Sequence, residues 1–205
     1  MLSIYQLKPK FQAFLRPYAD YLYSANITAN QVTLMAGFGS ILIAFIVGRF
    51  AAYQWIFGLI PIWMFIRMAL NAIDGMLARE YNQKSNLGAY LNEMCDVVSD
   101  CALLLIFTQI NQVDTILVIV IVLLSFLTEY VGVLGLMVGC ARRYDGPMGK
   151  SDRAFAFSLI SLGIATYLLP LDWLNILLLL ITFLLLITVI NRVRKGLQES
   201  KNNKV

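Results

Sequence analysis

The chain has 205 residues, of which 60% are hydrophobic and only 14% are charged, and its mean hydropathy is +0.73. Because a soluble domain carries about a quarter charged residues, this composition excludes a soluble globular protein and indicates an integral membrane protein. Histidine is absent, which excludes a His-based triad, metal site or proton shuttle. Cys95, Cys101 and Cys140 form no CxxC pair, so neither a disulfide framework nor a zinc site is expected.

The first 24 residues predict an amphipathic helix that lies in the lipid headgroup region. They lack the central apolar block of a signal peptide. Their apolar residues recur at steps of three and four, with basic residues between them. The apolar set is Ile4, Leu7, Phe11, Phe14, Tyr18 and Leu22, and the basic set is Lys8, Lys10 and Arg16. Thr28 and Gln31 then have the spacing of a capping box, which predicts a helix start.

Six membrane-spanning helices are expected after this segment, from apolar runs of about 20 residues. They are predicted near 30–48, 53–73, 87–109, 114–140, 152–169 and 172–191. Fourteen Lys and Arg residues fall on one side of these spans, and Arg49 alone falls on the other. Because basic loops stay in the cytoplasm, both termini are predicted to be cytoplasmic. The net charge of +4 is then explained by topology and not by nucleic-acid binding.

The predicted fold is therefore an all-α membrane protein of six transmembrane helices and an N-terminal interfacial helix. Its single domain divides into an interfacial helix (1–26), a six-span bundle (27–195) and a cytoplasmic tail (196–205). The small size and the lack of a signal sequence favour a bacterial cytoplasmic (inner) membrane.

Polar residues gather where the second and third predicted spans approach the cytoplasmic side. Asn71 and Asp74 are three residues apart and share a helix face. One sector of the third span, about 100° wide, carries an amide and three carboxylates. These belong to Asn92, Glu93, Asp96 and Asp100. Ionisable groups in a span are costly and usually face a bundle interior or a water-filled cavity.

This set of residue types indicates a metal and a phosphate. Clustered acids repel one another unless a cation neutralises them, and oxygen ligands without His or Cys suit Mg²⁺, Mn²⁺ or Ca²⁺. Arg79 offers a bidentate fork for a phosphate. Gly75 and Ala78 remove side-chain bulk, so that a ligand can approach the helix. Metal, phosphate and membrane together indicate phosphoryl chemistry on a lipid.

The segment 71–96 resembles the signature D-x2-D-G-x2-A-R-x8-G-x3-D-x3-D of the CDP-alcohol phosphatidyltransferases. Six of its eight fixed positions match in register, namely Asp74, Gly75, Ala78, Arg79, Gly88 and Asp96. Asn71 and Asn92 stand where the family has its first and third aspartates. The resemblance extends to a polar segment at 27–33 and covers residues 26–195.

The resemblance implies that a phosphatidyl group moves from a CDP-linked lipid, such as CDP-diacylglycerol, to a small alcohol, with release of CMP. It implies one or two Mg²⁺ or Mn²⁺ ions on the CDP pyrophosphate, held at Asn71, Asp74, Asn92 and Asp96. Gly75, Ala78, Arg79 and Gly88 would contact the CDP group. Asp96 would be the base that takes the proton from the acceptor, on the cytoplasmic side of the membrane. The resemblance also implies a homodimer.

Lys150 and Arg153 are the candidate acceptor-binding residues. They lie at a predicted helix start, where free backbone N–H groups favour an anion. The resemblance places the acceptor pocket at the beginning of the fifth span, which favours an anionic acceptor such as a phosphorylated alcohol. Topology alone also explains basic residues there.

Asn71 and Asn92 each remove one negative charge from the expected metal site. Glu93 is a candidate to replace it as a metal ligand, with Asp100 behind it. The alternative is that Glu93 faces the rim, Asp100 pairs with Arg67, and the protein binds one metal. Arg67 is expected to snorkel or to pair with an acid, or else to act in catalysis, while Glu129 either pairs structurally or lines the site.

Two other functions compete with the transferase. A homologue of weak or no activity could bind the CDP-lipid or act as a scaffold, which the two asparagines favour. A cation transporter could use the same acids, but the sequence lacks the internal repeats typical of transporters and this function leaves Gly75, Ala78 and Arg79 unexplained.

Overall fold

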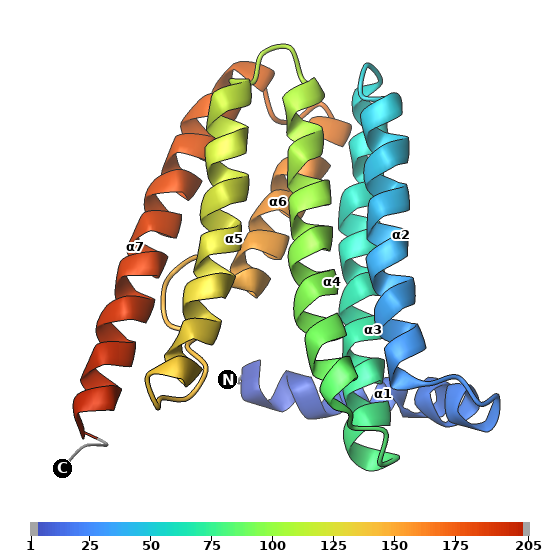
Figure 1. The fold of residues 1–205 in the computed structure, drawn as a ribbon. Helices are drawn as coiled ribbons and strands as arrows, with labels where there is room; N and C mark the ends of the chain where they lie inside the picture. The colour runs from blue at the N-terminus through green and yellow to red at the C-terminus, as the bar shows by residue number, and fades with distance from the viewer. Residues whose placement is uncertain (1–3, 203–205) are drawn as a thin grey trace. The chain divides into compact units, whose positions relative to one another are not determined.

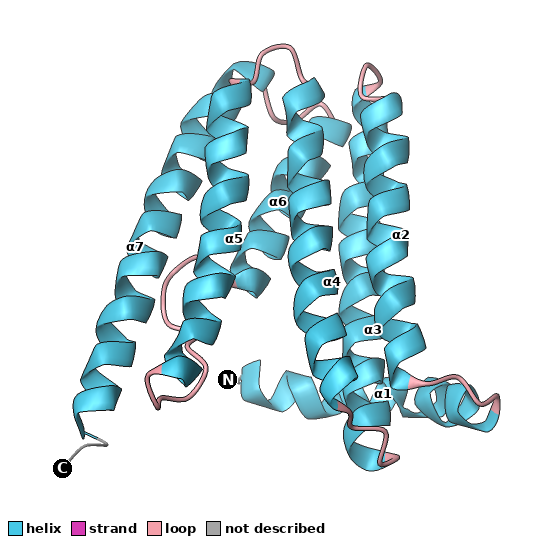
Figure 2. Ribbon diagram, viewed as in Figure 1, coloured by secondary structure: helices cyan, strands magenta, loops and turns pink. Residues whose placement is uncertain are grey.

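A computed structural model describes residues 4–202 of the chain, with side chains described from residue 11 onward. Figure 2 shows helices joined by short loops, and no strand occurs within residues 4–202. Over this range the seven α-helices are α1 (Ile4–Ser24), α2 (Ala29–Arg49), α3 (Leu59–Glu80), α4 (Asn86–Leu105), α5 (Thr115–Met137), α6 (Lys150–Ala165) and α7 (Leu174–Asn202). Three short 3-10 helices are η1 (Gln54–Gly58), η2 (Ile106–Gln109) and η3 (Leu171–Trp173). The all-α prediction is confirmed.

Within residues 4–202, four helical segments are long and apolar enough to cross a membrane. They are Ala29–Arg49, Gln54–Glu80, Thr115–Met137 and Leu171–Asn202. Helices α4 and α6 coincide with the two other predicted spans but do not belong to this group. Helix α4 carries three acids, and α6 has 16 residues, fewer than the roughly 20 that cross a bilayer. The six-span count therefore stays a prediction.

One helix start forms as predicted, and two helix ends differ from the predicted ends of the spans. The capping box forms as predicted, because Thr28 N donates to Oε1 of Gln31 (2.8 Å) and Gln31 N donates to Oγ1 of Thr28 (3.3 Å). Helix α3 does not end near residue 73 but continues to Glu80. Helix α5 ends three residues earlier than predicted, because Gly139 adopts a φ of +79° just beyond it and stops the helix.

The chain divides into two compact units, and α2, α3 and α4 each have residues in both of them. The first unit contains the residues up to Leu42 together with Ile62–Ser99. Within it, α1 lies crosswise to α2, α3 and α4 (Figure 1). Buried apolar residues of α1, α2 and α3 form one cluster there, made of Leu15, Ala19, Ala29, Val32, Ile73, Met76 and Leu77. This cluster is the core that fixes α1 against α3.

The predicted apolar residues of α1 divide between two sides of the helix, because Phe11 and Leu22 pack against the buried cluster while Phe14 and Tyr18 face outward. Leu15 and Ala19 are buried, whereas Phe14 and Tyr18 are 65% and 56% exposed. The helix thus has a protein-facing side and a second apolar side that faces outward, as an interfacial helix requires. The predicted positions Ile4, Leu7, Lys8 and Lys10 lie outside the described side chains.

Small residues let α2 approach its neighbours in the first unit. A Cβ at Gly37 would lie 3.1 Å from Sγ of Cys95 on α4, and a Cβ at Gly39 would lie 2.2 Å from the Trp63 ring on α3. The Trp63 indole N–H donates to Oγ of Ser40 (2.9 Å). Close backbone approach at glycine, with a side-chain hydrogen bond beside it, is typical of helix packing in membranes.

The second unit contains Ile43–Pro61 and the residues from Asp100 onward. Helices α5 and α7 lie side by side in it (Figure 1), and α6 packs on η1. Three buried aromatic rings connect its elements: Phe57 meets Phe107 at 5.7 Å between ring centroids, and Phe107 meets Phe157 at 5.2 Å. Edge-to-face contacts of this kind add to the area that the rings bury.

Candidate active site

Every residue of the 71–96 signature lies in the first unit. Helix α3 carries its first five members, from Asn71 to Arg79, and α4 carries Gly88, Asn92 and Asp96. Because α3 continues to Glu80, the first half of the signature is entirely helical. The side chains of Asn71 and Asp74 therefore project from one face of α3, as their spacing predicts.

Asp74 is buried and is held by a residue of α2. The Thr33 hydroxyl donates to Oδ2 of Asp74 at 2.7 Å, and Asp74 is only 5% exposed. A short hydrogen bond to a carboxylate both fixes the side chain and offsets part of the cost of burying it. Thr33 was not predicted as a site residue, although it ends the polar 27–33 segment that belongs to the family resemblance.

Asp96 receives two donors from α3 at one of its oxygens. Nη2 of Arg67 lies 3.1 Å from Oδ1 of Asp96 and also donates to the Asp96 backbone carbonyl (3.1 Å). Nδ2 of Asn71 donates to the same Oδ1 at 3.2 Å. Arg67 is 4% exposed. The prediction that Arg67 pairs with an acid is thus confirmed, and its partner is the predicted base.

Gly75 and Arg79 are one helical turn apart on α3, and the Arg79 guanidinium lies where a side chain at position 75 would have to be. A Cβ at Gly75 would lie 2.9 Å from Nη2 of Arg79. The glycine therefore allows the guanidinium to lie back along α3, while the Arg79 side chain remains exposed to a ligand. A guanidinium held in this way presents its planar fork for a phosphate.

Gly88 has a packing role at the start of α4. Its backbone N–H donates to Oγ of Ser85 at 2.9 Å, which caps the helix. A Cβ at Gly88 would lie 2.7 Å from Oδ1 of Asn30 on α2. The glycine thus lets the 27–33 segment approach the second half of the signature.

Asn92 and Glu93 are partly buried on α4. Among the residues that the structure describes, no three Asp, Glu, Cys or His side chains are close enough together to hold one metal ion. Glu93 does not complete such a group with Asp74 and Asp96. The metal-binding roles of Asn92 and Glu93 stay predictions.

A cluster of buried charges occupies the second unit. Glu129 of α5 accepts from Arg153 (3.0 Å) and Arg142 (3.2 Å), and Nη1 of Arg192 lies 3.5 Å from it. Arg153 also binds Asp100 at 3.0 Å and is 2% exposed. Glu129 is therefore a paired acid, and three arginines from distant parts of the sequence surround it.

The basic segment after α5 is also held by ion pairs. Arg143 contacts Asp145 at 2.7 Å and pairs with Glu199 of α7. Helix α6 begins at Lys150, close to the predicted start, with Gly149 as its N-cap and the Asp152 carboxylate accepting from Gly149 N (3.0 Å). Arg142 and Arg143 therefore both bind acids.

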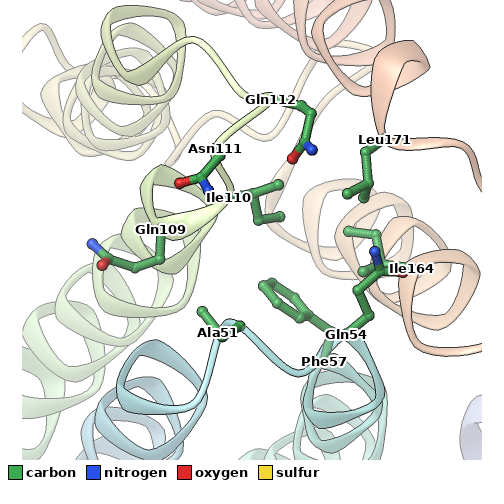
Figure 3. A pocket seen from close by; sticks show the side chains of 10 residues that line it. Ala51, Gln54, Phe57, Gln109, Ile110, Asn111, Gln112, Ile164 and Leu171 are labelled. Atoms are coloured by element: carbon green, nitrogen blue, oxygen red, sulfur yellow. The ribbon is translucent and has the colours of Figure 1, made fainter.

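The second unit also contains a cavity of about 180 Å³ between the loops that hold η1, η2 and η3 (Figure 3). Its polar lining comes from the amide side chains of Gln54, Gln109, Asn111 and Gln112, and the rest is largely apolar. No residue of the signature lines it. Its amides carry no charge that could bind a pyrophosphate.

Comparison with known proteins decides the family. Residues 26–191 match the family described as CDP-alcohol phosphatidyltransferase, in agreement with the span of the sequence resemblance. The chain belongs to this family. It is 46% identical over 196 residues to the inner membrane protein YnbA of Escherichia coli (strain K12), covering 96% of this chain and 97% of that protein. It is 31% identical over 97 residues to an uncharacterized protein of Aquifex aeolicus (strain VF5), covering 46% of each.

Solved structures agree on the fold of the family. Phosphatidylinositol phosphate synthase of Mycobacterium tuberculosis, crystallised with manganese and citrate, superimposes with a TM-score of 0.75 at 19% identity, over 89% of this chain and 88% of that one. The same enzyme with CDP-DAG bound gives a TM-score of 0.69 at 21% identity, over 91% and 92%. This family of metal-dependent transferases thus shares its fold with the present chain.

Proposed function

We propose that this protein transfers a phosphatidyl, or other substituted phosphate, group from a CDP-linked lipid to a small alcohol and releases CMP. The observation that carries the proposal is the signature on α3 and α4, which keeps Asp74, Arg79 and Asp96 in register within one compact unit. The crystal structure of the mycobacterial synthase with CDP-DAG supports a lipid donor of this class.

The chain's own residues have separate parts in this reaction. Arg79, whose guanidinium lies over Gly75, binds the pyrophosphate of the CDP group. Asp96 takes the proton from the acceptor hydroxyl, whose oxygen forms a bond to the lipid-side phosphorus. The bond from that phosphorus to the CMP oxygen then breaks, and CMP leaves with the electron pair. Arg67 and Asn71 both donate to Oδ1 of Asp96, which fixes the orientation of this carboxylate.

The donor groups fit a divalent cation such as Mg²⁺ or Mn²⁺. Asp74, Asp96 and the amides of Asn71 and Asn92 offer only hard oxygen ligands. Such a cation neutralises pyrophosphate charge and stabilises the leaving group when it is bound. Glu93 remains a candidate to supply the charge that the two asparagines lack.

The proposed location is a bacterial inner membrane, with six spans and the signature on the cytoplasmic side. The name of the Escherichia coli relative, the four long apolar helices and the 14-to-1 distribution of loop charge support it. Helices α4 and α6 would then cross the bilayer within the protein, where α4's acids avoid lipid. The homodimer implied by the family resemblance is retained as a prediction.

A panel of acceptors tests the transfer itself. The purified full-length protein is incubated with CDP-diacylglycerol and glycerol 3-phosphate, inositol, inositol phosphate or serine, and the lipid products are identified by mass spectrometry. A new lipid that carries one acceptor is the expected result. Binding of CDP-diacylglycerol without any product would instead support the homologue that binds the lipid but does not transfer it, which the amides at 71 and 92 favour.

We further propose that Lys150 and Arg153 hold an anionic group of the acceptor. Substitution of Arg153 is a poor test, because it leaves Asp100 and Glu129 as buried acids without this partner and destabilises the fold. Lys150→Gln avoids this problem. It should raise the acceptor KM more than the CDP-lipid KM. Equal effects on both would show that Lys150 does not bind the acceptor and that topology alone explains its charge.

A further inference from the structure

Thr33 connects helix α2 to Asp74 inside the first unit. Its hydroxyl donates to Oδ2 of Asp74 at 2.7 Å, and the two residues are only 6% and 5% exposed. The same hydroxyl lies 3.1 Å from the carbonyl oxygen of Ala29, one turn back along α2. A hydroxyl has one hydrogen to donate, and the shorter bond to a charged acceptor is the stronger of the two. Thr33 therefore serves Asp74 first and its own helix second.

The start of α2, which carries Thr33, is fixed by the loop between α3 and α4. Oε1 of Gln83 in this loop accepts from the backbone N–H of Ala29 at 2.7 Å. Ala29 lies in the first turn of α2, where the N–H groups have no partner within the helix. Gln83 thus caps α2 from a distant part of the sequence, in addition to the local capping box of Thr28 and Gln31.

These contacts form a closed path around the second position of the signature. Helix α3 carries Asp74 and leads into the loop that holds Gln83. Gln83 binds the start of α2, and Thr33 of α2 returns to Asp74. Val32 and Ile73, the chain neighbours of Thr33 and Asp74, both belong to the buried apolar cluster. The carboxylate is therefore held in one orientation before any ligand binds, as a precise metal site requires.

We propose that Thr33 is a positioning residue of this site, which holds the Asp74 carboxylate in the orientation that binds a divalent cation, and that Gln83 seats Thr33 through the start of α2. A carboxylate that is oriented in advance loses less freedom when the cation binds, and loss of such a partner typically weakens metal binding about 10- to 100-fold. The inference rests on the proposed function only in taking a divalent cation as the cofactor of the signature residues.

Mn²⁺ affinity tests the inference without any turnover. The full-length protein, purified in detergent and stripped with EDTA, is titrated with Mn²⁺, and free Mn²⁺ is measured by electron paramagnetic resonance. Thr33→Val keeps the shape of the side chain without its hydroxyl and should weaken binding by about tenfold or more. Thr33→Ser keeps the hydroxyl and should bind Mn²⁺ nearly as the wild type does. Unchanged or tighter binding in Thr33→Val, or an equal loss in both variants, would overturn the inference.

Thr182→Val is the matched control for the lost hydroxyl. Thr182 of α7 donates to the Leu178 carbonyl oxygen at 2.8 Å, one turn back along its own helix, so this variant loses the same kind of helix contact away from the signature. Its Mn²⁺ affinity should be that of the wild type, and a loss as large as in Thr33→Val would contradict the proposal. If Thr33→Val does not fold, Thr33→Ala removes the same hydroxyl, and wild-type affinity in that variant would be equally decisive against it.

Gln83→Leu tests how Thr33 is seated. It removes the acceptor of the Ala29 N–H and should weaken Mn²⁺ binding by less than Thr33→Val, because the local capping box still starts α2. Gln109→Leu makes the same change at an exposed position of η2, and an equal affinity in the two glutamine variants would overturn the role of Gln83. Mn²⁺ binding as predicted, with no product in the acceptor panel, would keep the inference and contradict the proposed function. Product formation with wild-type Mn²⁺ affinity in Thr33→Val would do the reverse.

Discussion

At the scale of single residues, Gly75 shows how the signature combines small and charged side chains. The sequence predicts that Gly75 makes room for a ligand, and the structure places the guanidinium of Arg79 in that room. Under the proposed function, the glycine serves ligand binding through the arginine that lies over it. A larger residue at this position would leave the helix intact and move the guanidinium of Arg79.

Gly75→Ala is predicted to weaken donor binding without unfolding the protein. The new methyl group would lie 2.9 Å from Nη2 of Arg79, which is the mobile end of a long side chain, so that the guanidinium moves and the backbone does not. Loss of one hydrogen bond to a charged group should raise the KM for the CDP-lipid by about tenfold.

Gly48→Ala is the matched control, because a Cβ there meets only Ile106 at an ordinary 3.5 Å. It should leave the CDP-lipid KM unchanged. An unchanged KM in Gly75→Ala, or an equal rise in both variants, would contradict the role assigned to Gly75.

Local sequence patterns predicted contacts between residues that are close in the sequence, but they did not predict which distant residues pair. The capping box at Thr28 and Gln31 follows from three-residue spacing alone and forms as predicted. The ion pair of Arg67 with Asp96 joins residues 29 apart, whereas the sequence suggested Asp100 as the partner of Arg67, an acid that the structure pairs with Arg153. Only the packing of α3 against α4 selects between these two acids.

At the scale of elements, α1 supports the helix that carries Asp74 and Arg79. Arg16 of α1 pairs with Glu80 at 2.7 Å, and the Tyr81 hydroxyl donates to Asp20. This hydrogen bond raises the pKa of the Tyr81 phenol above its ordinary value of 10.0. Exposed ion pairs contribute little, which leaves the apolar cluster around Ala19 as the main support.

Ala19→Leu is predicted to destabilise the protein by about 1–3 kcal/mol, because Ala19 is completely buried and the cluster has no space for a larger side chain. Ala13→Leu on the same helix is the control, since Ala13 is exposed, and its effect should stay within about 0.5 kcal/mol. Thermal unfolding of the detergent-solubilised protein measures both. Equal shifts would show that α1 does not dock as described.

Helix lengths explain why the positions of the helices could be predicted from the sequence, whereas their assignment as membrane spans was less certain for two of them. The apolar runs of α2, α3, α5 and α7 are long enough to identify spans directly. Helix α6 is short, and α4 carries the three acids Glu93, Asp96 and Asp100 among its apolar residues. Charged residues at a functional site reduce the hydropathy signal in the element that carries the chemistry. The end of α3 was missed for the same reason, since its last turns are polar.

At the scale of the whole molecule, the distribution of charge predicts topology. Residues near 50 and near 111 should be extracytoplasmic, while residue 146 should be cytoplasmic. Single cysteines at Ala51, Asn111 and Gly146, each in a background without Cys95, Cys101 and Cys140, test this with a membrane-impermeant label on intact cells. Labels are expected at 51 and 111. Labelling at 146 from outside would overturn the assignment of sides.

The charged cluster around Glu129 shows what the whole sequence left undecided. Its arginines lie at 142, 153 and 192 and converge on one acid of α5. In the sequence, topology explained all three arginines, since basic residues are common on the cytoplasmic side, and Arg153 was also a candidate to bind the acceptor. Glu129 was equally consistent with a structural pair or with a site. Convergence of distant segments depends on tertiary packing, which local patterns do not encode.

Metal-dependent release of CMP tests the central claim most directly. The purified protein is supplied with CDP-diacylglycerol, Mn²⁺ and the acceptor panel, and CMP is quantified by chromatography. The account predicts CMP release by the wild type and by Asp172→Ala, an exposed aspartate of η3 that serves as the control. It predicts no release by Asp74→Ala, by Asp96→Ala or in excess EDTA. CMP release that continues unchanged in Asp74→Ala or in EDTA would contradict the assignment of the signature as the active site.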